Sequence, residues 1–195
     1  MNLPNKLTML RIILIPVFTI LLVLGWPAGT IMLGSAKLSV TYLVAAIIFV
    51  AASLTDLADG KIARARHLVT NFGKFADPLA DKLLVMTAFI FLTAAGIIPA
   101  WGVAIILWRE LAVTGLRLLL ANGGEVLAAA WPGKIKTVTQ DLAIVFLFMN
   151  DFGIPAIFGV GLGEILFYLA VIFTVYSGVE YFYKNRSVFA DSFGQ

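Results

Sequence analysis

The chain has 195 residues, of which 61% are hydrophobic and only 13% are charged. Because soluble domains carry about 25% charged residues, this composition excludes an ordinary water-soluble domain and predicts a protein embedded in lipid. The absence of cysteine excludes disulfides, thiolate metal sites and a cysteine nucleophile. The net charge of +3 is small, and we expect no nucleic-acid partner.

Six apolar stretches of the chain are candidates for membrane-spanning helices, which need about 20 residues each. In chain order they cover Leu7–Leu24, Leu38–Thr55, Leu83–Trp108 with a turn at Gly96–Pro99, about Pro99–Leu120, Ile135–Met149 and Gly161–Tyr183. The sequence therefore predicts an all-α integral membrane protein with six transmembrane helices, in a single domain over residues 1–195.

Lysine and arginine are distributed unevenly between the two sets of loops that connect these stretches. One set has Lys37 as its only base. The other set, together with both termini, carries Lys6, Arg11, Lys61, Arg64, Arg66, Lys74, Lys134, Lys136, Lys184 and Arg186. Because basic loops stay on the cytoplasmic side of a membrane, we expect both termini in the cytoplasm. The even number of spans agrees with that orientation.

Four aspartates stand between the second and third apolar stretches, in the pattern D-x2-D-G-x2-A-R-x8-G-x3-D-x3-D. They are Asp56, Asp59, Asp77 and Asp81. At 100° per residue the first two lie about 60° apart on a helix and the last two about 40° apart, so each pair shares a face. Carboxylates are costly near a bilayer, and clustered oxygen ligands suit Mg²⁺, Ca²⁺ or Mn²⁺. We therefore predict a metal site at the cytoplasmic ends of the second and third helices, joined by a short basic turn containing Gly73.

Three residues next to the aspartates favour a phosphate ligand for such a metal. Gly60 and Ala63 are small enough to let a ligand or a helix approach closely. Arg64 can donate two hydrogen bonds to phosphate oxygens. Two other interpretations stay open: the acids are solvated helix ends at the membrane surface, or they line the pathway of a divalent-cation transporter, in which Arg64 would repel the passing ion.

The complete pattern resembles the signature of the CDP-alcohol phosphotransferase family at all eight positions. These are Asp56, Asp59, Gly60, Ala63, Arg64, Gly73, Asp77 and Asp81. The resemblance implies a homodimeric six-helix membrane enzyme that moves a phosphatidyl or similar group from a CDP-linked donor to an alcohol and releases CMP. It implies that the aspartates hold one or two Mg²⁺ or Mn²⁺ ions on the CDP diphosphate, and that Asp81 is also the general base on the acceptor hydroxyl. The small residues and Arg64 would contact the donor.

The N-terminal segment resembles a second family pattern, N-x2-T-x2-R. Asn5 and Thr8 offer an amide and a hydroxyl group at helix spacing, which suit the nucleotide base or a phosphate of the donor. Arg11 completes the pattern. An ordinary helix start with a cationic anchor is the alternative.

Four bases farther along the chain supply more positive charge than a neutral alcohol requires: Arg109, Arg117, Lys134 and Lys136. Arg109 and its neighbour Glu110 point about 100° apart, so we do not expect them simply to neutralise each other. A helix N-terminus with lysines and a threonine is suited to phosphate. We therefore predict that these bases hold a phosphate on the acceptor. The alternatives are structural pairing with Glu110 or Asp141 and snorkelling of the lysines to the membrane interface.

Within the family, the Arg109-Glu110 pair and the pattern G-K-x-K-T-x-x-Q at residues 133–140 resemble the bacterial members that make phosphatidylglycerophosphate. That resemblance implies CDP-diacylglycerol as donor, sn-glycerol 3-phosphate as acceptor, and a place among the lipids of the bacterial cytoplasmic membrane. The same chemistry on inositol phosphate, serine or phosphatidylglycerol is the alternative.

Overall fold

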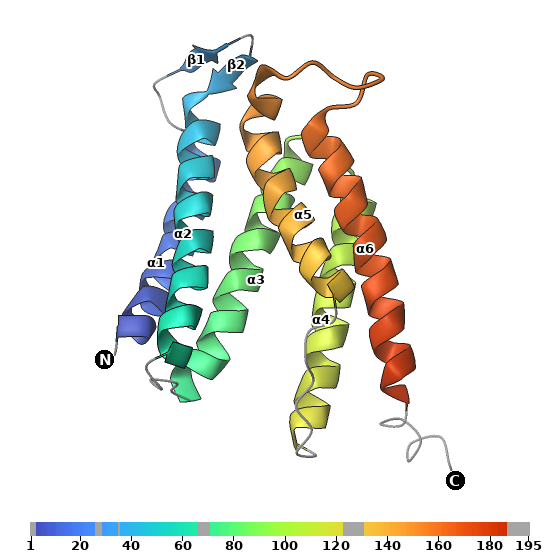
Figure 1. Ribbon diagram of the computed structural model, residues 1–195. Coiled ribbons are helices and arrows are strands. Elements are labelled where there is room, and N and C mark those ends of the chain that lie inside the picture. The colour runs from blue at the N-terminus through green and yellow to red at the C-terminus, as the bar shows by residue number, and fades with distance from the viewer. Residues whose placement is uncertain (1–2, 26–28, 35, 66–70, 123–130, 187–195) are drawn as a thin grey trace.

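The structure is a computed structural model that describes residues 3–25, 29–34, 36–65, 71–122 and 131–186. For residues 3–4, 33, 36, 57–65, 71–72, 74–75, 118–119 and 121–122 it describes the backbone alone. Six long helices account for most of it (Figure 1). They are α1 Leu3–Leu24, α2 Val40–Ala65, α3 Asn71–Ala94, α4 Ala100–Asn122, α5 Trp131–Phe148 and α6 Leu162–Lys184. A short antiparallel hairpin of β1 Thr30–Leu33 and β2 Ala36–Ser39 joins α1 to α2, and a 3-10 turn, η1 Asn150–Gly153, follows α5.

The six predicted helices are present, with two differences at their ends. Helix α2 continues ten residues past the predicted end at Thr55, so that Asp56 and Asp59 lie inside the helix. Gly73 lies within the first turn of α3 instead of in a turn between the helices. The predicted turn at Gly96–Pro99 is confirmed, and Gly96 has a φ of 73°, which glycine adopts without steric cost.

The membrane character of the helices is supported most directly for the first and the last. By length and composition, Asn5–Leu24 and Leu162–Lys184 can each cross a bilayer, and Val40–Asp56 is a shorter apolar helix. Large apolar side chains also cover the outside of the molecule, including Ile13, Val23 and Ile172, which are 57%, 65% and 61% exposed. Such a surface suits lipid.

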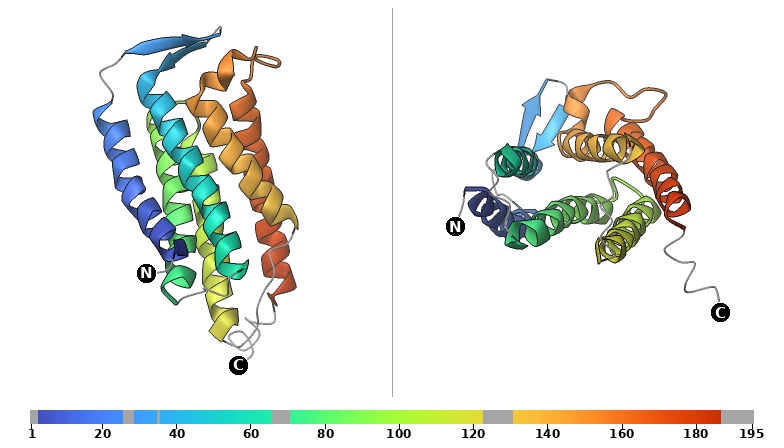
Figure 2. Two further views of the ribbon diagram at one scale, coloured as in Figure 1. Left: turned by 60° about the vertical axis from the view of Figure 1, so that its left-hand side comes forward. Right: turned by 60° about the horizontal axis from the view of Figure 1, so that its bottom comes forward.

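The helices run side by side along one common direction, with both ends of the described chain at the same end of the bundle (Figure 1). We call this the terminal end, and the opposite end, with the hairpin and η1, the hairpin end. Viewed obliquely from the terminal end, the helices are arranged in a ring, and α5 lies against α6 (Figure 2).

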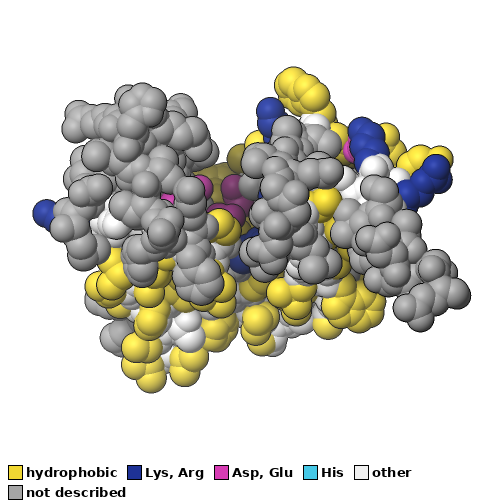
Figure 3. All heavy atoms as spheres, turned by 90° about the horizontal axis from the view of Figure 1, so that it is seen from below, with side chains coloured by type: hydrophobic (Ala, Val, Ile, Leu, Met, Phe, Trp, Pro, Cys, Tyr) yellow, Lys and Arg dark blue, Asp and Glu magenta, His cyan; other side chains and the backbone are white. Residues whose placement is uncertain are grey.

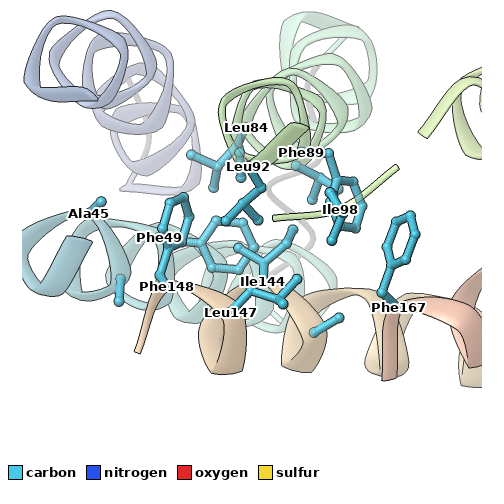
Figure 4. Close-up of a cluster of buried hydrophobic side chains, with 14 of the residues drawn as sticks. Ala45, Phe49, Leu84, Phe89, Leu92, Ile98, Ile144, Leu147, Phe148 and Phe167 are labelled. Carbon is cyan, nitrogen blue, oxygen red and sulfur yellow. The ribbon is translucent and has the colours of Figure 1, made fainter. Parts of the chain in front are cut away.

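Aromatic side chains from five helices form the centre of the core. Phe18, Phe49, Phe89, Phe148 and Phe167, from α1, α2, α3, α5 and α6, are each at most 1% exposed. The rings of Phe18 and Phe148 meet edge to face with centroids 6.0 Å apart, a favoured geometry for aromatic pairs. Figure 4 shows part of this cluster, in which Phe49, Leu84 and Ile144 converge. The core fixes α2, α3 and α5 relative to one another, and so positions the polar residues that these helices carry toward the terminal end.

Candidate active site at the terminal end

Acidic side chains lie inside a hollow at the terminal end of the bundle (Figure 3). Of the four predicted aspartates, the side chains of Asp56 on α2 and of Asp77 and Asp81 on α3 are described. The side chains of Asp59, Gly60, Ala63 and Arg64 lie outside the described part, although their backbone continues α2. Gly73 is buried at the start of α3.

Helix α1 contacts both acidic helices through two buried polar side chains. The guanidinium of Arg11 forms an ion pair with Asp56, with Nη1 2.7 Å from Oδ1, and Arg11 is only 1% exposed. The hydroxyl of Thr8, also 1% exposed, donates a hydrogen bond to Oδ1 of Asp77. The N-terminal pattern therefore orients the acids of α2 and α3. The predicted contacts of Asn5 and Thr8 with a nucleotide stay predictions.

Asp81 lines two adjoining cavities among the helices. It lies one turn beyond Asp77, on the polar first half of α3 and before the apolar stretch that begins at Leu83. Burial, and after it the negative charge of Asp56, raises the pKa of Asp81 to about 6. Within the ranges where side chains are described, no three acids or histidines gather closely enough to hold one ion together. The metal site, to which Asp59 would also contribute, stays a prediction.

The four predicted phosphate-binding bases all line one cavity of about 420 Å³, and Asp81 lies on its wall. Arg109 and Arg117 come from α4, and Lys134 and Lys136 come from the first turns of α5. Residues far apart in sequence thus meet beside the predicted general base. This juxtaposition of a cationic cavity with a buried carboxylate is the main geometric finding at the site.

One expectation about these bases is wrong. Arg109 Nη1 lies 3.1 Å from Oε1 of its neighbour Glu110, so the two residues do form an ion pair. The same oxygen of Glu110 pairs with the ammonium of Lys136. The 100° between adjacent positions describes where side chains leave the helix, and the long arginine side chain bridges that angle. Glu110 therefore compensates part of the charge in the cavity.

The remaining contacts of the bases hold them against aromatic rings and against α6. Arg117 Nε donates to the hydroxyl of Tyr181 at 3.2 Å, and its guanidinium lies 5.4 Å from the centroid of that ring. Lys134 Nζ lies 5.2 Å from the ring centroid of Trp131, and its side chain is exposed. Arg109 Nη2 donates to Ser177 at 3.1 Å. Arg117 and Lys134 thus have no acidic partner among the ion pairs of the described side chains.

No role was predicted from the sequence for Lys82, whereas Gln140 was treated only as part of a pattern and Asp141 only as an alternative ion-pair partner. A recess of about 50 Å³ adjoins the cationic cavity, and its wall includes Lys82, Gln140 and Asp141. The ammonium of Lys82 donates to the hydroxyl of Thr114 on α4. Helical spacing is the sequence signal that indicates the position of Gln140 and Asp141 at the site, since they follow Lys136 and Thr137 by one turn. Similarly, Arg11 was recognised as part of a pattern, but its pairing with Asp56 depends on how α1 packs against α2.

Several known proteins are similar to this chain over most of its length. A relative from Bacillus subtilis (strain 168), named CDP-diacylglycerol–glycerol-3-phosphate 3-phosphatidyltransferase, is 48% identical over 184 residues, which cover 94% of this chain and 95% of the relative. A protein of the same name from Rickettsia bellii is 37% identical over 188 residues, covering 96% and 97%. A probable phosphatidylglycerophosphate synthase from Mycobacterium tuberculosis is 38% identical over 180 residues, covering 92% and 79%.

The family model for CDP-alcohol phosphatidyltransferase matches residues 1–176, which include every predicted site residue. The match begins in the α1 segment that contacts the acids and extends into α6, which packs against the cationic cavity. The chain is therefore a member of the CDP-alcohol phosphatidyltransferase family.

Proposed function

We propose that this protein transfers the phosphatidyl group of CDP-diacylglycerol to sn-glycerol 3-phosphate and produces phosphatidylglycerophosphate and CMP. The observation that carries the proposal is the cavity in which Arg109, Arg117, Lys134 and Lys136 surround a space that Asp81 borders. An acceptor with a phosphate at one end and a hydroxyl at the other matches such a cavity. The names of the relatives from Bacillus subtilis and Rickettsia bellii support both substrates.

The reaction needs one proton acceptor and a set of phosphate ligands. The oxygen of the acceptor hydroxyl attacks the phosphorus that carries the diacylglycerol, and the bond from that phosphorus to the bridging oxygen breaks. CMP leaves with the bridging oxygen. Asp81, which borders the cavity, takes the proton of the attacking hydroxyl.

The acceptor phosphate is held in this proposal by the cationic cavity. Arg117 and Lys134 supply charge that no acid among the described ion pairs compensates, and Arg109 and Lys136 add donors that Glu110 holds in place. Arginine and lysine hydrogen bonds to phosphate are among the stronger ones in proteins. The ion pairs to Glu110 keep the two bases in position before the substrate arrives.

We further propose that Asp56, Asp59, Asp77 and Asp81 hold one or two Mg²⁺ or Mn²⁺ ions. The carboxylate set fits these hard cations in type, and Arg11 and Thr8 orient two of its members as outer partners commonly do. Such a cation, when bound, supplies charge stabilisation on the diphosphate and on the departing CMP. Asn5, Thr8, Gly60, Ala63, Arg64 and Gly73 contact the CDP part of the donor in this proposal.

The proposal extends to the membrane. The six helices cross the bacterial cytoplasmic membrane as one domain, the terminal end and its site face the cytoplasm, and the enzyme works as a homodimer. The lysines and arginines of the predicted loops support this orientation. Soluble glycerol 3-phosphate would then enter from the water at the terminal end, and the donor from the surrounding lipid.

The direct test is an assay of purified protein in detergent with Mg²⁺, CDP-diacylglycerol and labelled glycerol 3-phosphate. We expect label in a lipid product, release of CMP, and loss of both after a chelator removes the metal. Parallel reactions with serine, inositol phosphate and phosphatidylglycerol test the alternative acceptors. A lipid product with one of these and none with glycerol 3-phosphate would reject the proposed acceptor.

A further inference from the structure

We propose that Gln140 on α5 recognises the second hydroxyl of the acceptor, the one that does not attack, and so makes the enzyme specific for a vicinal diol phosphate. This inference rests on the proposed function and names a specificity-determining residue for it. It follows from an unsatisfied buried polar atom, from the recess that its residue lines, and from the geometry of the acceptor.

The first observation is the state of the Gln140 side chain. Gln140 is only 3% exposed, and its amide oxygen Oε1 is buried and accepts no hydrogen bond from the described part of the chain. A buried acceptor without a donor typically costs about 1–3 kcal/mol, and most such groups have a partner. The amide oxygen is therefore a candidate for a hydrogen bond with a bound ligand.

The second observation is where Gln140 lies. It lines the small recess of about 50 Å³, which shares Asp81, Lys82, Glu110, Lys136 and Thr137 with the larger cationic cavity. Among these shared residues, Asp81 is the proposed general base and Lys136 is a proposed phosphate ligand. An acceptor that reaches from the phosphate ligands to Asp81 passes the recess, which has room for one small polar group.

The third step is the chemistry of the acceptor. Glycerol 3-phosphate has one hydroxyl that attacks and a second on the adjacent carbon, which needs a hydrogen-bond acceptor when it is enclosed. The lining ammonium groups offer only donors, and Lys136 and Lys82 already pair with Glu110 and Thr114. A neutral amide oxygen accepts the bond without adding negative charge beside an anionic substrate. Asp141, which lines the same recess, would add that charge.

The test compares two acceptors with the wild-type protein and with a Gln140→Met variant of similar size. One acceptor is sn-glycerol 3-phosphate, and the other is 3-hydroxypropyl phosphate, which keeps the phosphate and the attacking hydroxyl but lacks the second hydroxyl. We expect the wild type to prefer glycerol 3-phosphate, and Gln140→Met to lower its kcat/KM for that acceptor roughly tenfold to a hundredfold. The variant's kcat/KM for 3-hydroxypropyl phosphate should stay unchanged.

The control is Thr139→Val on the same helix. The Thr139 hydroxyl donates within α5, to the carbonyl oxygens of Ile135 and Lys136, 2.9 Å away in each case. This variant removes a polar group next to Gln140 without touching either cavity, so the preference between the two acceptors should be retained. Asp141→Asn tests whether the Asp141 carboxylate, instead of the Gln140 amide, accepts the hydrogen bond in the recess. The measurement is again the ratio of kcat/KM for the two substrates.

Three results would overturn the inference. The first is an equal loss for both acceptors in Gln140→Met, which indicates a purely structural role. The second is loss of the preference in Asp141→Asn with retention in Gln140→Met. The third is a wild-type protein that uses both acceptors equally well. Because this result needs no variant, it tests the inference even if the Gln140→Met protein fails to fold. A wild type that is active with neither acceptor overturns the proposed function, and this inference with it.

Discussion

Asp81 and Asp77 lie one turn apart on α3 and are both proposed metal ligands, but only Asp81 is also the proposed general base. Asp81 borders both cavities, whereas Asp77 accepts a hydrogen bond from Thr8 on α1. Asp81→Asn should lower kcat roughly 10²- to 10⁴-fold, because the attacking hydroxyl loses its proton acceptor, while the affinity for CDP-diacylglycerol stays within a few-fold. Asp77→Asn should instead weaken the binding of metal and donor. Steady-state kinetics together with donor-binding isotherms check both variants, and an Asp81→Asn protein that binds donor as poorly as Asp77→Asn would contradict the division.

Lys134 has an exposed side chain whose ammonium lies over the ring of Trp131. Lys134→Ala should raise the KM for glycerol 3-phosphate roughly five- to tenfold, since one charged hydrogen bond to the phosphate is lost. The KM for the donor should change much less. Lys37→Ala, at the hairpin end, is the matched control and should leave both values unchanged. An equal rise of both KM values in Lys134→Ala would remove Lys134 from the acceptor pocket.

At this scale the sequence predicted that the four bases gather but not how they pair, and the gathering of the four acids stays a prediction. The four acids and four bases stand out because charge is costly in an apolar chain, and the structure brings the four bases and Asp81 to one cavity. The partners of Glu110 and of Arg11 were not predictable, because rotamers and helix packing decide which long side chain reaches which carboxylate. The role of Gln140 has the same origin, since its unsatisfied oxygen is visible only once its surroundings are known.

Two glycines on α4 differ sharply in the space around them. A Cβ atom at Gly102 would lie 2.7 Å from Cζ of Phe167 on α6, whereas a Cβ at Gly115 would meet nothing within 4 Å. Gly102→Ala should therefore destabilise the protein by about 1–3 kcal/mol, because a buried ring must move. Gly115→Ala should stabilise it by up to about 1 kcal/mol through helix propensity. Thermal unfolding in detergent compares the two, and a Gly102→Ala protein as stable as Gly115→Ala would refute the close α4–α6 packing.

Apolar stretches of the sequence predicted the six helices, and the differences between the predicted and the observed elements have physical causes. Helix α2 continues past Thr55 because a helix does not need to end where its apolar residues end: residues 57–65 carry helix formers such as leucine, lysine, alanine and arginine. The hairpin was not predicted, because Thr30–Ser39 has no clear alternation of polar and apolar residues. It is defined instead by pairing, with Thr30 opposite Ser39, and by Gly29 and Gly34 at φ of 76° and 61°.

On the scale of the whole molecule, the two ends of the bundle differ in chemistry. The terminal end carries the hollow with the acids, the cationic cavity and both ends of the described chain. The hairpin end carries β1, β2 and η1, where Asp151 accepts a hydrogen bond from the backbone N–H of Gly163 at 2.6 Å and so caps the N-terminus of α6. The sequence predicted this difference between the two ends from the distribution of lysine and arginine. The prediction was possible because it depends only on which loops carry the bases, and not on how their side chains pack.

The orientation of the bundle can be measured with single cysteines, because the chain has none of its own. Phe158 at the hairpin end is fully exposed, and the side chain of Lys184 at the terminal end is 64% exposed. A thiol reacts with a maleimide only where water allows it to ionise. In intact cells, a membrane-impermeant maleimide should label Phe158→Cys but not Lys184→Cys, and permeabilised cells should label both. Ala52→Cys, whose native side chain is fully buried in the core, should stay unlabelled throughout. The opposite pattern would place the site outside the cell, away from cytoplasmic glycerol 3-phosphate, and would contradict the proposed orientation.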